Sequence, residues 1–551
     1  MGDNSRESNS FIVKGSVLAM ASIISRILGL LYRMPLTAII GKTGNDYYGT
    51  AYEVYNIILI ISSYSIPLAV SKLVAARMSK GQVKNAYRIL RGSLGFAAIS
   101  GGTASLIVYF GADFFTGTLL QTPLSSIALK VLSPVLLIVA IVGVLRGFFQ
   151  GLHTTVPSAM SQVFEQIVNA VVSIAAAYFL FSYGAKVGAV LGDKDSYSAA
   201  YGAAGGTLGT AMGAVTALLF MLLIYFAYRK VLLKKVKRDH SRSEESYLSI
   251  IRVLIFTIIP VLLSTTLYNI SSIVNNGIFK NVVLAQGYDS KTISEWWGVF
   301  TGQYKVLINV PISVASALAA SAVPALAAAY ERGELKKVRR QIASANRFIM
   351  IVAFPCAVGL FVLAKPIMML LFGDSDQTTA NIMYLGTIAI VFYSLSTLSN
   401  GILQGINRMR IPVRNAAIAL VAQVVVLIIC LLCFNLNIFA VVIANTFYAL
   451  MMCILNELAV KKYSGAAIDL KRTFLIPGIV SIVMGLVVYV VYQLVNLIIN
   501  SNLIATVLSI ICGVVIYFVL MLLLRGITES ELRRVPKGNV IIAISKKMHL
   551  I

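Results

Sequence analysis

Long apolar segments recur along the whole chain, separated by short polar or basic stretches. Each is about 20 residues or longer, the length that a helix needs to cross a bilayer core about 30 Å thick. Alternating patterns of the membrane-barrel kind do not occur. The pattern predicts an all-α polytopic membrane protein with about fourteen transmembrane helices. By hydropathy the spans are 11–36, 47–71, 93–112, 127–151, 157–182, 199–228, 250–279, 296–330, 341–372, 378–406, 411–434, 437–460, 473–497 and 501–524.

Composition and charge support this interpretation. The 551 residues are 58% hydrophobic and only 12% charged, against about 25% charged in soluble domains. The net charge of +25 could suggest nucleic acid, but 36 of the 46 Lys and Arg residues fall on one side of the predicted spans and only 7 on the other. This asymmetry fits the positive-inside rule with both termini cytoplasmic. The basic loops therefore set topology and meet anionic lipid, and we expect no nucleic-acid partner.

The chain also repeats weakly, with an offset of about 252 residues. Each repeat unit holds six spans, an even number, so both units insert with the same orientation and their pseudo-two-fold axis follows the membrane normal. The matching positions are Gly81 with Gly333, Lys84 with Lys336, and the pair Gln150-Gly151 with Gln404-Gly405. The repeat predicts two six-helix lobes around a central cavity, plus two C-terminal helices.

These observations divide the chain into five predicted parts. We expect an N-lobe at 1–228, a basic cytoplasmic linker at 229–250, and a C-lobe at 251–460. Spans thirteen and fourteen follow at 461–526, and a cytoplasmic tail at 527–551. No charged residue stands between Arg472 and Arg525. That pair of spans is either peripheral lipid contact or a groove for an acyl or polyprenyl chain.

Two arginines interrupt the first span. Arg26 lies about fifteen residues into it, roughly 22 Å along a helix, and Arg33 lies about two turns further on. A guanidinium keeps its charge, and a charge near the bilayer centre costs roughly 3 kcal/mol. Such residues face interior cavities, where a guanidinium contacts phosphate or pyrophosphate in bidentate fashion. We expect an anion site here. The alternatives are a buried pair between Arg26 and an internal acid, and snorkelling of Arg33 to the interface.

Glu53 and Lys305 form a second candidate pair. The repeat offset maps one residue onto the other, so they would lie at equivalent depths on opposite lobes. Opposite charges there could pair across the cavity and close its outer mouth, and rocking of the lobes would break the pair. The alternative is local pairing, for example of Glu53 with Arg33.

Other polar residues inside the spans give less specific signals. Glu165 has an apolar repeat counterpart near Ala419, and is either a proton or cation site or a partner of Arg26. Asn275 and Asn276 belong to a polar cluster in span seven. Such residues either line a sugar-binding cavity or hold helices together.

Catalytic and metal-binding motifs are missing from the sequence. The three histidines fall on the basic side, and neither H-E-x-x-H nor a P-loop occurs. The pair Cys430 and Cys433 lies in an apolar run without histidine or acid partners, which indicates structural filler rather than a redox or metal site. We predict a protein that is not an enzyme and has no cofactor or metal. Na⁺, H⁺ or the membrane potential would supply its drive.

Three short motifs resemble those of a known superfamily. They are Ser25-Arg26-Ile-Leu-Gly29, the segment from Gly41 to Asp46, and the Gln-Gly turn at 150–151. With the fourteen spans and the repeat, they resemble the multidrug/oligosaccharidyl-lipid/polysaccharide (MOP) exporter superfamily over nearly the whole chain. Within it the chain is most similar to the MurJ-like lipid II flippases, and among those to the stage V sporulation protein B/YtgP branch.

The resemblance implies a bacterial plasma-membrane flippase for undecaprenyl-pyrophosphate-linked oligosaccharide, lipid II first among them, working by alternating access. Arg26 matches the family's essential span-one arginine, and Asp46 matches an acid just after that span. Arg33 departs from the pattern, because MurJ proteins place their next arginine where Tyr32 stands. Glu53 departs too, because MurJ proteins tend to be basic there. The last two spans would hold the polyprenyl tail.

Three alternative functions stay open on the sequence. The protein could export another lipid-linked polysaccharide unit. It could be a cation-coupled multidrug antiporter, although those relatives usually have twelve spans and an acid-rich cavity. A membrane glycosyltransferase, ligase or polymerase would need catalytic acids or histidine on an outer loop, and the outer-side acids here are scattered.

Overall fold

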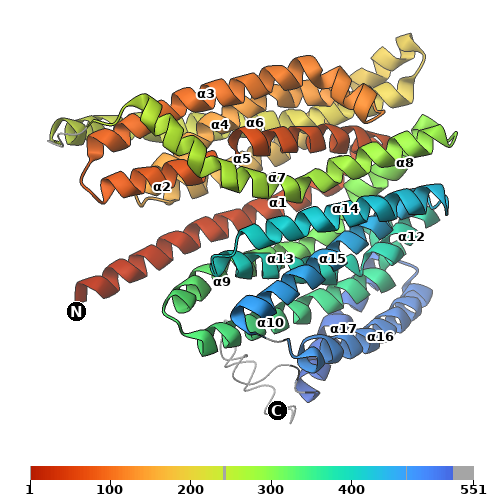
Figure 1. The fold of residues 1–551 in the computed structure, drawn as a ribbon. Coiled ribbons are helices and arrows are strands. Elements are labelled where there is room, and N and C mark those ends of the chain that lie inside the picture. The colour runs from red at the N-terminus through yellow and green to blue at the C-terminus, as the bar shows by residue number, and fades with distance from the viewer. Residues whose placement is uncertain (1, 240–243, 467, 525, 527–551) are drawn as a thin grey trace. The chain divides into compact units, whose positions relative to one another are not determined.

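The computed structural model of this protein describes residues 2–239, 244–466, 468–524 and 526 (Figure 1). Side chains are not described at 2–20, 22, 23, 26, 30, 260, 261, 263, 264, 267, 268, 320–325 and 328. Every regular element in the described part is a helix, which confirms the all-α prediction. The chain forms two compact units, Met1–Gly302 and Gln303–Ile551.

The described part of the first unit contains eight α-helices and two short π-helices, and a third π-helix, η3 (Phe300–Tyr304), begins in this unit and ends in the second. α3 packs on α4, and α4 packs on α6. α1 lies against α4, α5 and α6. The elements are α1 (Gly2–Leu59), η1 (Ile60–Tyr64), α2 (Ile66–Met78), α3 (Val83–Asp113), η2 (Phe114–Leu119), α4 (Ser125–Gly151), α5 (Val156–Leu191), α6 (Lys194–Lys237), α7 (Tyr247–Ala285) and α8 (Ser290–Val299).

Helix α1 is broken once, at Gly41. The φ and ψ angles there are 70° and −174°, a conformation that suits glycine because it has no Cβ. The apolar stretch Ile27–Met78 runs for 52 residues, about 78 Å of helix at 1.5 Å per residue, more than twice a bilayer core. The break therefore separates α1 into two arms. The loop that we expect between spans one and two is replaced by a single non-helical residue, Gly41.

Helices α5 and α6 approach each other closely because small residues line their interface. A Cβ on Gly205 would stand 2.5 Å from the Ala176 carbonyl oxygen, and one on Gly209 would meet Ser173 Oγ at 2.0 Å. Ser173 Oγ also donates a hydrogen bond to the Gly206 carbonyl at 2.9 Å. Small residues of this kind let membrane helices pack backbone against backbone.

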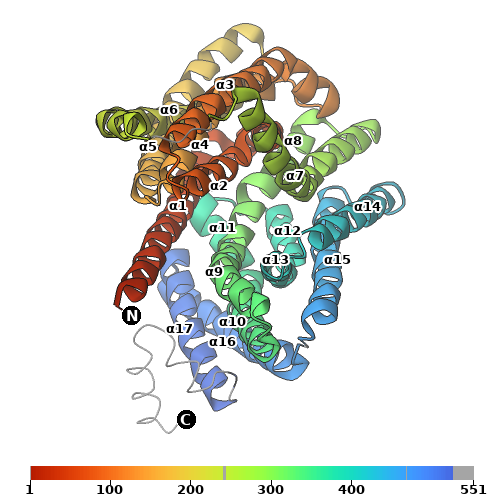
Figure 2. The same ribbon diagram turned by 60° about the vertical axis from the view of Figure 1, so that its left-hand side comes forward.

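The second unit is formed by the remaining helices (Figure 2). α13 packs against α9 and α15, α14 packs against α15, and α16 packs against α17 and α10. α12 and α13 together form one apolar segment bent by 43°. The elements are α9 (Lys305–Glu331), α10 (Leu335–Val362), α11 (Ala364–Phe372), α12 (Gln377–Gly386), α13 (Ala389–Gly405), α14 (Arg410–Leu432), α15 (Ile438–Ser464), η4 (Lys471–Leu475), α16 (Ile476–Ile499) and α17 (Asn502–Leu523).

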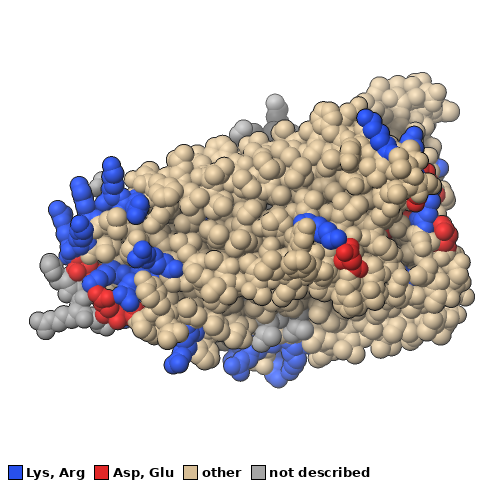
Figure 3. Space-filling model, turned by 90° about the horizontal axis from the view of Figure 1, so that it is seen from above, with Lys and Arg blue, Asp and Glu red and all other residues tan. Residues whose placement is uncertain are grey.

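Ten helices in the described part are long and apolar enough to cross a membrane, or eleven with the bent pair counted as one span. Helix α7 adds a shorter apolar stretch, Tyr247–Ile259. The protein is therefore a multi-pass membrane protein, and the count of fourteen stays a prediction. Figure 3 shows a broad surface with few charged side chains, while lysines and arginines gather toward its edges.

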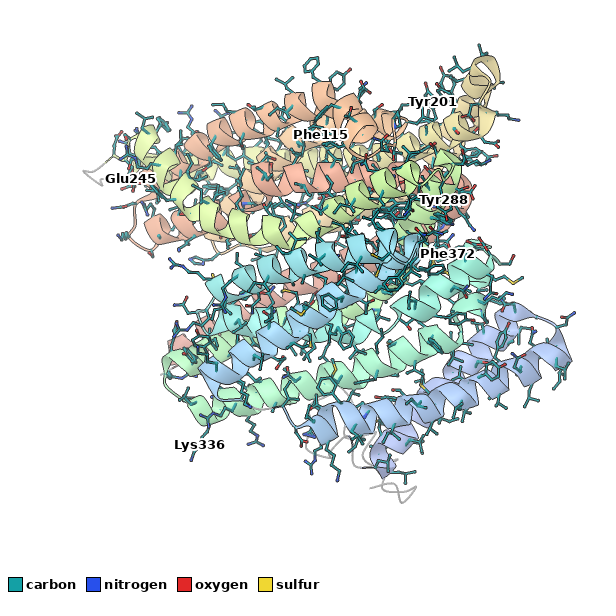
Figure 4. All side chains as sticks on the ribbon, turned by 45° about the vertical axis from the view of Figure 1, so that its right-hand side comes forward. Phe115, Tyr201, Glu245, Tyr288, Lys336 and Phe372 are labelled. Atoms are coloured by element: carbon teal, nitrogen blue, oxygen red, sulfur yellow. The ribbon has the colours of Figure 1, made fainter. Side chains whose placement is uncertain are left out.

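The boundary between the two compact units falls later in the sequence than the boundary between the lobes that the repeat predicts. The first unit includes α7 and α8, which the repeat placed in the C-lobe, so the predicted lobe boundaries stay a prediction. Part of the linker is anchored to the first unit, because Glu245 accepts from Arg77 Nε at 2.6 Å and from Arg77 Nη2 at 3.0 Å. Glu245 and Tyr288 lie at opposite ends of this unit (Figure 4).

Candidate functional site

The second arm of α1 presents three polar residues on one face. Asp46, Thr50 and Glu53 are spaced by four and three positions, which places them along one side of a helix. Helix α7 presents Ser272, Asn276 and Lys280, spaced by four, in the same way. The two helices are in contact, and these six residues form a polar ladder between them.

Lys280 and Asp46 form the most buried ion pair of the ladder. Lys280 Nζ lies 2.5 Å from Asp46 Oδ1, and the side chains are 1% and 0% exposed. The ammonium also donates to Thr122 Oγ1 at 2.6 Å and to Thr50 Oγ1 at 3.1 Å. All three donors of the ammonium are therefore used, and the indole of Trp297 lies 5.9 Å from Nζ. The contacts offset the cost of removing both charges from water.

Thr50 joins this pair to Glu53. Its hydroxyl donates to Asp46 Oδ1 at 2.9 Å and accepts from Lys280 and from Asn276 Nδ2, the latter at 3.2 Å. Asn276 also donates to Glu53 Oε2 at 2.8 Å, and Ser272 Oγ donates to Glu53 Oε1 at 2.5 Å. Each carboxylate therefore sits among donors of α7. This arrangement ties α1 to α7 over about two helical turns.

The two asparagines of span seven occupy different positions. Asn276 belongs to the ladder through its Nδ2, while Asn275 is 2% exposed and lies outside it; the Oδ1 atoms of both have no hydrogen-bond partner among the described residues. An unpaired buried amide oxygen costs free energy.

Arg33 lies over an aromatic ring. Its guanidinium carbon is 4.3 Å from the ring centroid of Tyr48, and Tyr48 stacks on Tyr52 with centroids 5.9 Å apart. Arg33 Nη1 is buried without a hydrogen-bond partner in the described part of the chain. Arg33 thus holds an unused donor, as an anion site requires. The side chain of Arg26, the other expected anion ligand, lies outside the described residues.

The remaining candidates are separate from the ladder. Glu165 of α5 pairs with Arg146 of α4 at 2.7 Å, and Arg146 Nε donates to Ser161 Oγ at 2.8 Å. Lys305 begins α9 in the second unit. Glu53 is engaged by α7 within the first unit, and its pairing with Lys305 stays a prediction.

Sequence reasoning missed Lys280 and Arg146. In the sequence both belong to the lysines and arginines whose distribution predicts the two membrane sides. The spacing of Ser272, Asn276 and Lys280 was the available signal, because it aligns them on one helix face. No comparable signal pointed to Arg146 as the partner of Glu165.

Comparisons with known proteins place the chain among membrane transporters. The family described as polysaccharide biosynthesis protein matches residues 12–330. The chain is 25% identical to the lipid II flippase MurJ of Bacillus subtilis (strain 168), over 89% of this chain and 90% of that protein. It is also 25% identical to stage V sporulation protein B of the same organism, over 95% of this chain and 97% of that protein.

Solved structures of membrane transporters are among those that share its fold. The inward closed conformation of the lipid II flippase MurJ superposes with a TM-score of 0.63 at 15% identity, covering 91% of this chain and 97% of that one. An inward-facing multidrug resistance MATE family transporter of the MOP superfamily gives 0.60 at 17% identity, covering 82% of this chain and 98% of that one.

Proposed function

Because the chain belongs to the polysaccharide biosynthesis protein family, we propose that it is an alternating-access flippase for undecaprenyl-pyrophosphate-linked oligosaccharide. Lipid II, the peptidoglycan precursor, is the leading substrate, moved from the inner to the outer leaflet of the bacterial plasma membrane. The observation that carries this proposal is the similarity to a lipid II flippase over 89% of the chain. Both termini are cytoplasmic in this proposal, which follows the distribution of basic loops.

The head group binds at the first span. Arg26 and Arg33 hold the pyrophosphate, since guanidinium groups pair bidentately with phosphate oxygens. Arg33 already carries an unused buried donor beside Tyr48. Aromatic rings such as Tyr52, which is 37% exposed, offer apolar faces to sugar rings, and Asn275 offers its unpaired oxygen to a sugar hydroxyl.

The polyprenyl tail lies along α16 and α17. Neither helix contains a charged residue, and a long row of large apolar side chains on them is exposed, as a lipid-facing groove requires. These two helices hold 24 and 22 residues. The flippase structure aligns with 91% of the chain and the multidrug transporter with 82%. The difference in aligned length is close to the combined length of α16 and α17. Exposed members include Leu486, Tyr489, Leu497, Ile498, Val514 and Val515.

The α1–α7 ladder closes the outer end of the pathway. Asp46 and Glu53 hold α7 through Lys280 and Asn276, and release of substrate requires these contacts to separate. Lys305 is an alternative partner for Glu53 once α7 has moved. Glu165 stays a candidate ion or proton site, with Arg146 as the group that it would have to leave.

Native mass spectrometry of the purified protein in mild detergent tests this function. The wild type is expected to retain a polyprenyl-pyrophosphate sugar that Arg26→Ala loses, and its mass names the glycan. Arg91→Ala is the control, because it also removes one arginine, but from α3, where the guanidinium lies 5.5 Å from the Tyr87 ring. If no such lipid binds even with lipid II in excess, the proposal is wrong.

The second candidate function is cation-coupled multidrug export, which the likeness to the MATE transporter favours. Proteoliposomes separate the two. A flippase moves labelled lipid II between leaflets and leaves cationic dyes in place, whereas an antiporter accumulates dye against an ion gradient. Export of a different lipid-linked polysaccharide unit would appear as a different co-purified mass.

A further inference from the structure

Basic side chains gather in the second unit where α14 begins and α15 ends. The two helices pack against each other (Figure 2). A short turn joins them, so they run in opposite directions, and the start of α14 meets the same membrane side as the end of α15. The basic residues there are all exposed. This α14–α15 basic cluster consists of Arg408, Arg410, Arg414, Lys461 and Lys462.

A tyrosine brings two of these cations together. The guanidinium carbon of Arg408 lies 4.6 Å from the ring centroid of Tyr463, and Lys462 Nζ lies 5.7 Å from it. Both cations are attracted to the negative face of the ring. Tyr463 is half-buried in the last turn of α15, and tyrosine is enriched at membrane–water interfaces. The ring therefore holds two positive charges at the point where the loop before α14 meets the end of α15.

The cluster has no acidic partner in the described part of the chain. None of its five cations forms an ion pair with a described carboxylate. Acids of the neighbouring loops pair with other cations: Glu334 with Arg332 and Lys337, and Asp469 with Arg472. The described carboxylates therefore leave the charge of the cluster unneutralised, which favours an anion from outside the chain.

Helix α14 continues from the cluster as an exposed apolar stripe. Arg414 is followed by Ile418, Val421 and Val425, whose spacings of four, three and four positions place all four residues on one helix face. The three apolar side chains are exposed. The distance from Arg414 to Val425 is about 16 Å at 1.5 Å per residue, close to half of a bilayer core about 30 Å thick. The stripe is therefore long enough to cross one leaflet.

Helix α15 shows the same arrangement in the reverse direction. Ile454 and Leu458 are exposed and precede Lys461 by seven and three positions, so the three residues share one helix face. Leu458 of α15 and Ile418 of α14 each lie about two helical turns from the basic end of their helix. Both helices therefore present apolar side chains to one leaflet and cations at its surface.

An anionic phospholipid has the complementary layout. Its phosphate lies at the membrane surface and its acyl chains run through one leaflet. Basic pockets between transmembrane helices on the positive side of a membrane bind such head groups. A soluble phosphate ion would match the charge of the cluster but not the apolar stripes.

We propose that the α14–α15 basic cluster binds the phosphate head group of an anionic glycerophospholipid, whose acyl chains lie along the exposed stripes of α14 and α15. Arg408 and Lys462, held at Tyr463, contact the phosphate. The lipid belongs to the leaflet on the basic side of the protein. The site goes beyond the proposed flippase function and does not depend on it.

Brominated lipids test the site in proteoliposomes of the full-length protein. Leu458→Trp places an indole on the α15 stripe, where bromine atoms on an adjacent acyl chain quench its fluorescence. The native Trp296 and Trp297 belong to the first unit, and the signal of the wild type is subtracted. The association constant at the reporter should be several-fold higher for brominated phosphatidylglycerol than for brominated phosphatidylcholine. Equal quenching by the two lipids overturns the proposal.

Charge variants in the same reporter background assign the preference to the cluster. Arg408→Gln/Lys462→Gln should abolish it, because both cations at Tyr463 are removed. Arg332→Gln/Lys337→Gln is the matched control: it removes two cations of the same unit that pair with Glu334, and should keep the preference. A preference that survives in the first variant, or is lost equally in both, overturns the proposal.

Added salts separate a lipid site from a site for soluble anions. Millimolar inorganic phosphate at constant ionic strength should leave the preference for phosphatidylglycerol in place, whereas its loss would show a soluble-anion site and overturn the proposal. High ionic strength should weaken the preference because salt screens exposed charges. A preference that salt does not change would contradict contact between the cluster and the phosphate. Because no lipid II is present, failure here leaves the flippase function standing, and failure of flipping leaves this site standing.

Discussion

Lys280 Nζ lies 2.5 Å from Asp46 Oδ1, although the two residues are 234 positions apart in the sequence. Both side chains are almost fully buried. The pair therefore owes its stability to mutual neutralisation and to the hydroxyl groups of Thr50 and Thr122. Removing one charge would strand the other, which is a larger penalty than the pair's own net contribution.

Lys280→Met should destabilise the protein by about 3–5 kcal/mol, the typical cost of breaking a buried pair. The double variant Asp46→Asn/Lys280→Met should lose less, because no charge is left unpaired. A double-mutant cycle on the midpoints of denaturant unfolding in detergent measures this coupling. Lys291→Met is the control, since its pair with Asp195 is 3.7 Å long and exposed and should contribute no more than about 1 kcal/mol. Equal losses in the single and double variants would contradict the prediction.

Arg33→Lys should weaken binding of a soluble polyprenyl-pyrophosphate analogue about tenfold, equivalent to about 1.4 kcal/mol. Lysine keeps the charge but loses the planar donor pair and its stacking on Tyr48. Calorimetric titration of the purified protein gives the affinity. Arg91→Lys changes the same kind of cation–π contact on α3 and should bind like the wild type. A similar loss in both variants would point to general electrostatic attraction.

Gly298→Ala should destabilise the first unit by about 1–3 kcal/mol, the usual cost of overpacking. A Cβ there would stand 1.8 Å from the Lys42 carbonyl oxygen, and a backbone atom cannot move aside as a flexible side chain can. Gly95→Ala is the matched control: a Cβ on this helical glycine of α3 meets nothing within 4 Å, so helix propensity predicts a gain of up to about 1 kcal/mol. The midpoint of thermal unfolding should fall for the first variant and hold or rise for the second.

The ion pairs that Glu244 of the linker makes with Lys84 and Arg88 should weaken in acid. Lys84, which hydrogen-bonds Glu244, and the nearby Arg88 lower the pKa of Glu244 from its usual value of 4.5. Since the folded-state pKa lies below the unfolded one, this contribution is fully present above about pH 4.5 and is lost as the pH falls through the folded-state pKa. The difference in unfolding midpoint between the wild type and Glu244→Gln should therefore shrink toward zero in acid. A difference that stays constant as the pH falls well below 4.5 would argue against the linkage.

Several features of the fold followed from local patterns in the sequence. Runs of about 20 apolar residues must form helices in a membrane, because a helix satisfies its own backbone hydrogen bonds. The helical class and the membrane location could therefore be predicted without a structure. The two arms around Gly41 could be anticipated as separate spans, but not the single glycine that joins them.

The candidate site was only partly predictable, because hydropathy and charge are local properties whereas partners depend on which helix faces meet. The sequence by itself marked Glu53, Asn276 and Glu165 as unusual, since polar groups inside spans are costly, whereas Asp46 stood out only through the family resemblance. Only the tertiary structure decided that Asp46 pairs with Lys280 and Glu165 with Arg146. A buried charge must find its partner within a few ångströms, and helix packing alone determines which residue stands there.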